Sequence, residues 1–224
     1  MSSEIREPKL REKIQIEGIR KTIAERLSYS NREIPAAYLT VDVDMGKVMA
    51  DREKRAERPS INAYLVKACA NALMRHPYVN STTDGDTISL AAEANVCVAV
   101  DTPNGLYAPV IGNAEAKSLA QISKEISELA DKARKGELQL YDLTGGTFTV
   151  SNLGSFGVEF FIPIINPPQT GILGVGRIRD NGHAYLTLSM DHRVFDGAEG
   201  ARFLADLKKE IEENVGSFPR PGVF

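Results

Sequence analysis

The chain has 224 residues, of which 42% are hydrophobic and 25% charged, a composition typical of a soluble globular protein. The formal net charge is −3 and the lysines and arginines are scattered, so no basic patch suited to nucleic acid is evident. No apolar run approaches the roughly 20 residues of a membrane-spanning helix, and the charged start "MSSEIREPKLREK" lacks the apolar centre of a secretory signal. We therefore expect a protein of the cytoplasm that binds neither nucleic acid nor membrane.

The hydrophobic pattern predicts helices and strands that mix without strict alternation. Residues 1–16 are charged and aperiodic, and we expect them to form an arm or the remnant of a linker before one domain over residues 17–224. In the first half of that domain, the pattern predicts a helix at 17–30, a strand at 37–45, a charged helix at 44–57 and a buried helix from the cap residue Ser60 to His76.

The second half predicts three strands, then a long amphipathic helix from Ser118, two further strands around a proline-broken connection, a last strand and a last helix. We expect these elements at 86–90, 95–101, 106–113, 118–133, 145–154, 160–178, 184–191 and 198–214. The mixture indicates an α+β or mixed α/β fold built on one large sheet.

The two cysteines, Cys69 and Cys97, both lie among apolar neighbours. We interpret them as buried, reduced thiols; the alternatives are a disulfide or a nucleophile. No neighbouring residue would obviously lower the pKa of either thiol.

The segment "LSMDHRVFDG" carries a histidine, His192, four residues before an aspartate, Asp196. A metal pair would lack a third ligand, since His76 and His183 lie at a helix end and a turn. A structural pair would tie a strand to a helix, and chance alone often produces this spacing. A catalytic histidine would act as a general base, because a free imidazole with a pKa near 6.5 accepts a proton from a thiol or hydroxyl at neutral pH.

A general base at His192 would activate a bound substrate directly. No cysteine or serine stands where a covalent nucleophile is expected, and "TVSNLG" does not match the Gly-x-Ser-x-Gly elbow. The reaction also needs a donor for an oxyanion, and the glycine-rich stretch "GGTFTVSNLGSFG" offers one in Ser151. Residue patterns alone leave these alternatives open.

Five blocks together resemble the catalytic domain of dihydrolipoamide acyltransferases, the core enzymes of 2-oxo acid dehydrogenase complexes. They are "GIRKTIAERL", "NVCVAVDTPNGLYAPVIGNAEAKSL", "GGTFTVSNLGSFG", "IINPPQTGILGVG" and "LSMDHRVFDGAEGARFL", in the family's order and over nearly all of the chain from Glu17 onward. The resemblance implies a chloramphenicol acetyltransferase-like fold, a large mixed sheet flanked by helices, that forms trimers. It also implies an active-site channel between subunits, in which an acyl group moves between dihydrolipoamide and coenzyme A.

The resemblance assigns His192 as the general base and Ser151, from the neighbouring subunit, as the donor to the oxyanion. Asp196 matches the aspartate that organises the active-site loop, and Arg20 looks like its ion-pair partner. The implied coenzyme A contacts are Arg52, Ser60, Asp101, Asn152 and Gly176, and no metal is expected.

The resemblance also implies partners. Homotrimers of the family build a larger hollow core, which works with a lipoyl domain, a 2-oxo acid decarboxylase or dehydrogenase, and dihydrolipoamide dehydrogenase. This chain contains no lipoyl domain, so the lipoyl group would come from elsewhere, and we favour a catalytic piece of a longer protein. Compared with most relatives the chain is short between Gly176 and Leu188, and it has Ala36 and Gly112 where histidine and arginine are common.

Two other functions fit parts of the sequence. A small-molecule O-acetyltransferase of the chloramphenicol type would share the fold and the His-x-x-x-Asp-Gly pattern, but "GGTFTVSNLG" and "INPPQ" favour the lipoamide family. A scaffold would keep the fold and trimer without chemistry, against which the intact His192, Asp196 and Ser151 argue.

Overall fold

A six-stranded mixed sheet forms the centre of the computed structural model, which describes residues 9–103 and 105–218. The strand order is β1-β10-β9-β8-β4-β7, and β8 runs parallel to both of its neighbours while the other pairs are antiparallel. The bounds are β1 Ala36–Asp44, β4 Val96–Val98, β7 Val110–Ile111, β8 Phe148–Asn152, β9 Gly171–Val175 and β10 His183–Asp191. This is the large mixed sheet that the sequence predicts.

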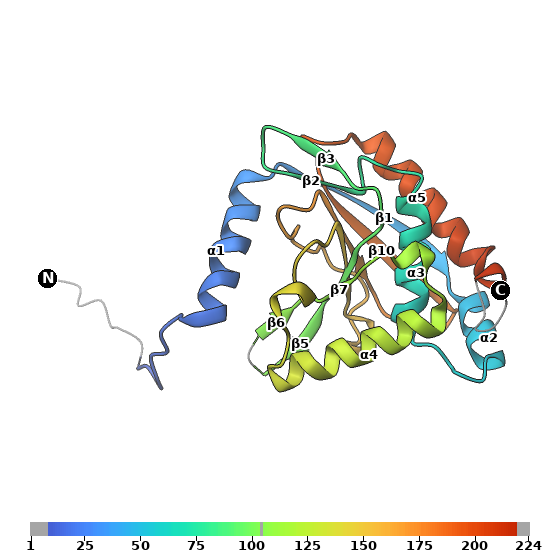
Figure 1. Ribbon diagram of the computed structural model, residues 1–224, viewed down its shortest axis with the longest axis horizontal. Coiled ribbons are helices and arrows are strands. Elements are labelled where there is room, and N and C mark those ends of the chain that lie inside the picture. The colour runs from blue at the N-terminus through green and yellow to red at the C-terminus, as the bar shows by residue number, and fades with distance from the viewer. Residues whose placement is uncertain (1–8, 104, 219–224) are drawn as a thin grey trace, which may run out of the picture.

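Helices cover the sheet unequally. In Figure 1, α2, α3, α4 and α5 lie together on one side of the sheet, and α1 stands on the other. The bounds are α1 Gly18–Glu33, α2 Gly46–Lys54, α3 Ile61–Leu73, α4 Leu119–Lys135 and α5 Gly197–Glu212. Helix α3 is buried along nearly its whole length because it lies between the sheet and the neighbouring helices α4 and α5. None of the helices in the described part of the chain is long and apolar enough to cross a membrane.

Four shorter strands form two small ribbons outside the main sheet. They are β2 Ser81–Thr83 with β3 Ile88–Leu90, and β5 Val100–Thr102 with β6 Gly105–Tyr107. The continuous strand predicted at 95–101 is therefore wrong in detail. The chain leaves the main sheet after β4, since the Ala99 N–H still bonds the Val150 carbonyl whereas Val100 pairs with β6.

The charged helix predicted at 44–57 is shorter than expected. The side chain of Asp44 accepts the N–H of Gly46, so the helix begins only at Gly46. It ends at Lys54, where Arg55 turns to an extended conformation. The strand β2 was not predicted, because three polar residues give no periodic signal.

Both cysteines are buried and free, as predicted. Burial raises the pKa of each thiol, and at Cys97 it does so even though the Gln169 side chain donates a hydrogen bond to Sγ at 3.2 Å.

Helix α4 starts at a complete capping box. The Ser118 hydroxyl accepts the Gln121 N–H at 3.3 Å, and the Gln121 side chain accepts the Ser118 N–H at 2.8 Å. Ser118→Ala should lower the free energy of unfolding by about 1 kcal/mol, because it leaves the Gln121 N–H in the first turn without its acceptor. Urea unfolding measures this, and Ser127→Ala, in the exposed middle of the same helix, is the control. That substitution should be neutral or slightly stabilising, and equal losses at the two positions would contradict the cap.

Candidate active site

His192 lies on a turn that joins the sheet to α5. Strand β10 ends at Asp191, and the exposed His192 follows it. The His192 N–H bonds the Pro35 carbonyl at 3.1 Å, so the turn is attached to the segment that enters β1. Phe195, three residues later, is buried in the core and attaches the far end of the turn to it. The backbone of His192 is thus held while its imidazole faces outward.

The buried carboxylate of Asp191 shapes this turn. It is fully buried, and it accepts hydrogen bonds from the Arg193 N–H at 3.0 Å, from Nε at 2.9 Å and from Nη2 at 2.7 Å. These bonds raise the pKa of the Arg193 guanidinium. Neither residue was predicted from the sequence, although they flank His192 directly as an Asp-x-Arg pattern.

Asp196 serves as the N-cap of α5. Its carboxylate accepts the Glu199 N–H at 2.9 Å, which anchors the helix to the end of the His192 turn. Arg20 is exposed on α1, and within the described residues no ion pair joins it to Asp196. The predicted Arg20–Asp196 pair is therefore not formed within this single chain.

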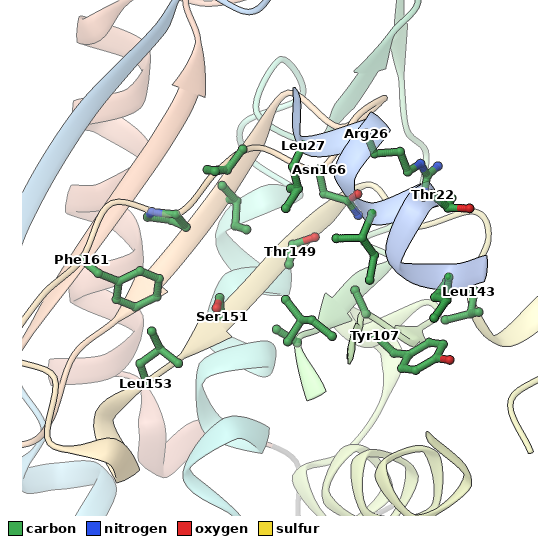
Figure 2. A pocket seen from close by; sticks show the side chains of 18 of the residues that line it. Thr22, Arg26, Leu27, Tyr107, Leu143, Thr149, Ser151, Leu153, Phe161 and Asn166 are labelled. Atoms are coloured by element: carbon green, nitrogen blue, oxygen red, sulfur yellow. The ribbon is translucent and has the colours of Figure 1, made fainter. Parts of the chain in front are cut away.

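A cavity of about 430 Å³ lies between α1 and the sheet and contains Ser151. Figure 2 shows the side chains of Ser151 and Thr149 on the same strand, with Leu153 and Phe161 beside Ser151. Most of the wall is apolar. A hydroxyl in such surroundings interacts more strongly with a developing negative charge than it would in water.

His192 does not line the Ser151 cavity. One chain therefore presents the candidate oxyanion donor in a cavity and the candidate base on an exposed turn outside it.

A second cavity, of about 470 Å³, gathers three of the predicted coenzyme A contacts: Ser60, Asn152 and Gly176. The Asn152 side chain donates to Asn62 Oδ1 at 2.8 Å and accepts the Gly154 N–H at 2.9 Å. A Cβ at position 176 would lie 1.8 Å from the Glu159 carbonyl oxygen, so only glycine fits there. Because successive strand residues point to opposite faces, Ser151 and Asn152 serve the two cavities on the two faces of β8.

The other two predicted contacts lie outside both cavities. The Arg52 side chain donates to the Pro59 carbonyl at 2.9 Å, which brings it next to Ser60 without lining the cavity. Asp101 is exposed on β5. The described residues contain no group of three or more histidines, cysteines or acidic residues that could hold a metal ion.

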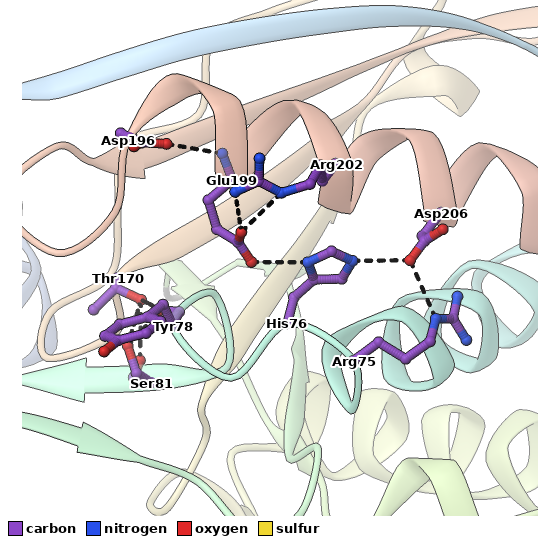
Figure 3. A network of polar contacts seen from close by, with 9 residues as sticks. All are labelled: Arg75, His76, Tyr78, Ser81, Thr170, Asp196, Glu199, Arg202 and Asp206. Atoms are coloured by element: carbon purple, nitrogen blue, oxygen red, sulfur yellow. Dashed lines mark hydrogen bonds and ion pairs between the residues drawn. The ribbon is translucent and has the colours of Figure 1, made fainter.

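His76 links α5 to the end of α3 (Figure 3). Its Nδ1 lies 2.9 Å from Glu199 and its Nε2 2.9 Å from Asp206, so both ring nitrogens face carboxylate oxygens. A carboxylate only accepts hydrogen bonds, so each contact needs a hydrogen on the ring nitrogen that faces it. The bonds to His76 lower the pKa of Glu199 and the pKa of Asp206. From the sequence, His76 was predicted only to lie at a helix end.

The fold matches chloramphenicol acetyltransferase with a TM-score of 0.55 at 15% identity, over 88% of this chain and 99% of that one. The fold is therefore that of the chloramphenicol acetyltransferase-like class, as the sequence predicts.

Within that class the match is more specific. The family described as "2-oxoacid dehydrogenases acyltransferase (catalytic domain)" matches residues 8–218, and the chain belongs to this family. It is similar to the solved cubic core of a pyruvate dehydrogenase multienzyme complex, with a TM-score of 0.84, 32% identity and coverage of 92% of this chain and 93% of that one.

Two curated relatives differ in the acyl group that their names specify, acetyl in one and succinyl in the other. The chain is 43% identical to the mitochondrial dihydrolipoyllysine-residue acetyltransferase component of the pyruvate dehydrogenase complex of Caenorhabditis elegans, over 89% of this chain and 44% of that protein. It is 40% identical to the dihydrolipoyllysine-residue succinyltransferase component of the 2-oxoglutarate dehydrogenase complex of Rickettsia typhi, over 90% of this chain and 55% of that protein. The chain thus spans about half the length of these relatives.

The His76 contacts predict a pH-dependent contribution to stability. His76→Gln should lower the free energy of unfolding at pH 7 by about 1–2 kcal/mol, mostly through Glu199, because the Asp206 side chain is 40% exposed. Carboxylates with a lowered folded pKa stabilise the fold above their ordinary range near pH 4 and lose that effect as pH falls through the lowered pKa. Urea unfolding of both proteins should therefore show the difference shrinking between pH 6 and pH 3. A difference that stays constant over this range would contradict the charged network.

Proposed function

We propose that the chain transfers an acyl group between dihydrolipoamide and coenzyme A, as the core of a 2-oxo acid dehydrogenase complex. The observation that carries the proposal is the fixed, outward-facing His192 in a chain that belongs to an acyltransferase catalytic family. The relatives named above, one acetyltransferase and one succinyltransferase component, support this class of reaction.

The proposed reaction needs a base and an oxyanion donor. His192 accepts the proton of the attacking thiol, and the sulfur attacks the carbonyl carbon of the thioester. The carbonyl oxygen becomes an oxyanion that accepts a hydrogen bond from Ser151. When the intermediate collapses, the C–S bond to the departing thiol breaks and that sulfur takes the proton back from His192. No acyl-enzyme forms.

We infer that each active site combines His192 of one copy with Ser151 of another. The absence of His192 from the lining of the Ser151 cavity supports this division. Holding the base, the donor and both thiols together converts the attack into an effectively unimolecular step. Asp196 acts as a positioning residue, because it caps α5 directly after the His192 turn. Arg20 is proposed to pair with Asp196 once copies assemble.

The cavity around Ser60, Asn152 and Gly176 is the proposed site for coenzyme A, with Arg52 and Asp101 as outer contacts. The lipoyl group is proposed to arrive on a lipoyl domain of a longer protein or of a partner. The similarity to a cubic pyruvate dehydrogenase core supports trimers that assemble into a larger hollow core with decarboxylase or dehydrogenase and dihydrolipoamide dehydrogenase components. The proposed location is the cytoplasm or the mitochondrial matrix.

Mixing two inactive variants tests the shared site. His192→Ala and Ser151→Ala, each assembled alone, should lose at least about 10²-fold in acyl transfer to free dihydrolipoamide. In assemblies co-expressed at equal amounts, about a quarter of the sites should combine an intact His192 with an intact Ser151, if copies mix at random. Activity should therefore return to about a quarter of the wild-type value.

The control is co-expression of two differently tagged Ser151→Ala chains, which should remain inactive. Mixed assemblies without recovery would contradict a site shared between copies. A folded wild type inactive with acetyl-, succinyl- and branched-chain acyl-CoA would contradict the transfer itself, and activity with chloramphenicol-type alcohols would favour O-acetyl transfer.

A further inference from the structure

The cavity around Ser60, Asn152 and Gly176 has one charged residue in its lining, Arg177. Every other lining residue is apolar or neutral. Arg177 directly follows Gly176, and its N–H bonds the Val158 carbonyl at 2.7 Å, so its backbone is fixed at the cavity edge. No sequence pattern had marked Arg177 as a functional residue.

The Arg177 side chain forms an ion pair with Glu159 that an anionic ligand can replace. Its Nε and Nη2 both contact one oxygen of Glu159, at 2.7 and 2.5 Å. The two side chains are 36% and 47% exposed, so the ion pair contributes little to stability. A guanidinium has five N–H groups, and Glu159 contacts only those on Nε and Nη2. An anionic ligand can therefore take over the guanidinium at small cost.

The same cavity has a second positive feature. Helix α3, 13 residues long, begins at this cavity with Ser60 as its N-cap, and its first turn contains no acidic residue. The N-terminal end of a helix carries a partial positive charge. The two features together suit a ligand with phosphate groups, which arginine binds through paired hydrogen bonds.

We propose that Arg177 binds a phosphate group of coenzyme A and that Glu159 competes for it. This inference rests on the proposed function for the identity of the ligand. Arg177 then determines specificity: it favours a phosphorylated thiol carrier over an unphosphorylated one with the same reactive thiol. Glu159 competes with the phosphate for Arg177 and so limits the affinity of the protein for coenzyme A.

Two acyl donors test this role in the assembled protein. For Arg177→Gln we expect the KM for the preferred acyl-CoA to rise about tenfold, with kcat unchanged, because a charge-assisted phosphate contact is lost. The KM for the corresponding S-acyl-pantetheine should not change, since that donor has no phosphate. Glu159→Gln should lower the KM for acyl-CoA and leave that for acyl-pantetheine unchanged.

Arg179→Gln is the matched control. Arg179 lies in the same turn but does not line the cavity, because it contacts Asp42 and the ring of Tyr185. This variant loses the same charge and should keep the preference for acyl-CoA. Equal KM changes for the two donors in Arg177→Gln, or no change for either, would overturn the proposal.

Calorimetric binding of coenzyme A and of pantetheine separates this inference from the proposed function. Coenzyme A affinity that falls in Arg177→Gln while pantetheine affinity does not would support the phosphate contact even in a protein without transfer activity. Wild-type protein that binds neither compound would overturn the inference as well.

Discussion

The candidate site depends on one interaction, the contact of the buried Asp191 carboxylate with the partly exposed Arg193 at the end of β10. A fully buried carboxylate is stable only when it is paired and hydrogen-bonded, and here a single arginine supplies three bonds. Those bonds close the chain around His192. The imidazole between them is exposed but its backbone is not free, which is the arrangement that a positioned base requires.

The division of functional groups within the chain follows from the sheet. Strand β8 directs Ser151 to the cavity under α1 and Asn152 to the cavity beside α3, because neighbouring strand residues point to opposite faces. His192 lines neither of these two cavities. If each active site joins His192 of one copy to Ser151 of another, activity would depend on assembly. A lone chain would then have no site that contains both residues.

The sequence predicted the local features well and the long-range ones poorly. The alternation in residues 37–45 matches β1, Ser60 caps its helix as expected, and the amphipathic helix begins at Ser118 as expected, because these signals lie within a few residues. The family and fold were recognised from five blocks and are confirmed. The Arg177–Glu159 pair was not visible, since its members are 18 residues apart, and neither was the contact of His76 with Glu199, 123 residues away. The roles of His192, Ser151, Asp196 and Arg20 remain predictions.

The most direct test of the Asp191 interaction is the steady-state rate of acyl transfer by Asp191→Asn, with its assembly checked by sedimentation. The amide keeps the size of the side chain but removes the charge that holds Arg193. We predict a folded, assembled protein whose kcat falls by about tenfold or more, because His192 is misplaced. The KM for acyl-CoA should be unchanged, because the proposed coenzyme A cavity is intact. A variant with the wild-type kcat would contradict the claim that this buried carboxylate positions His192.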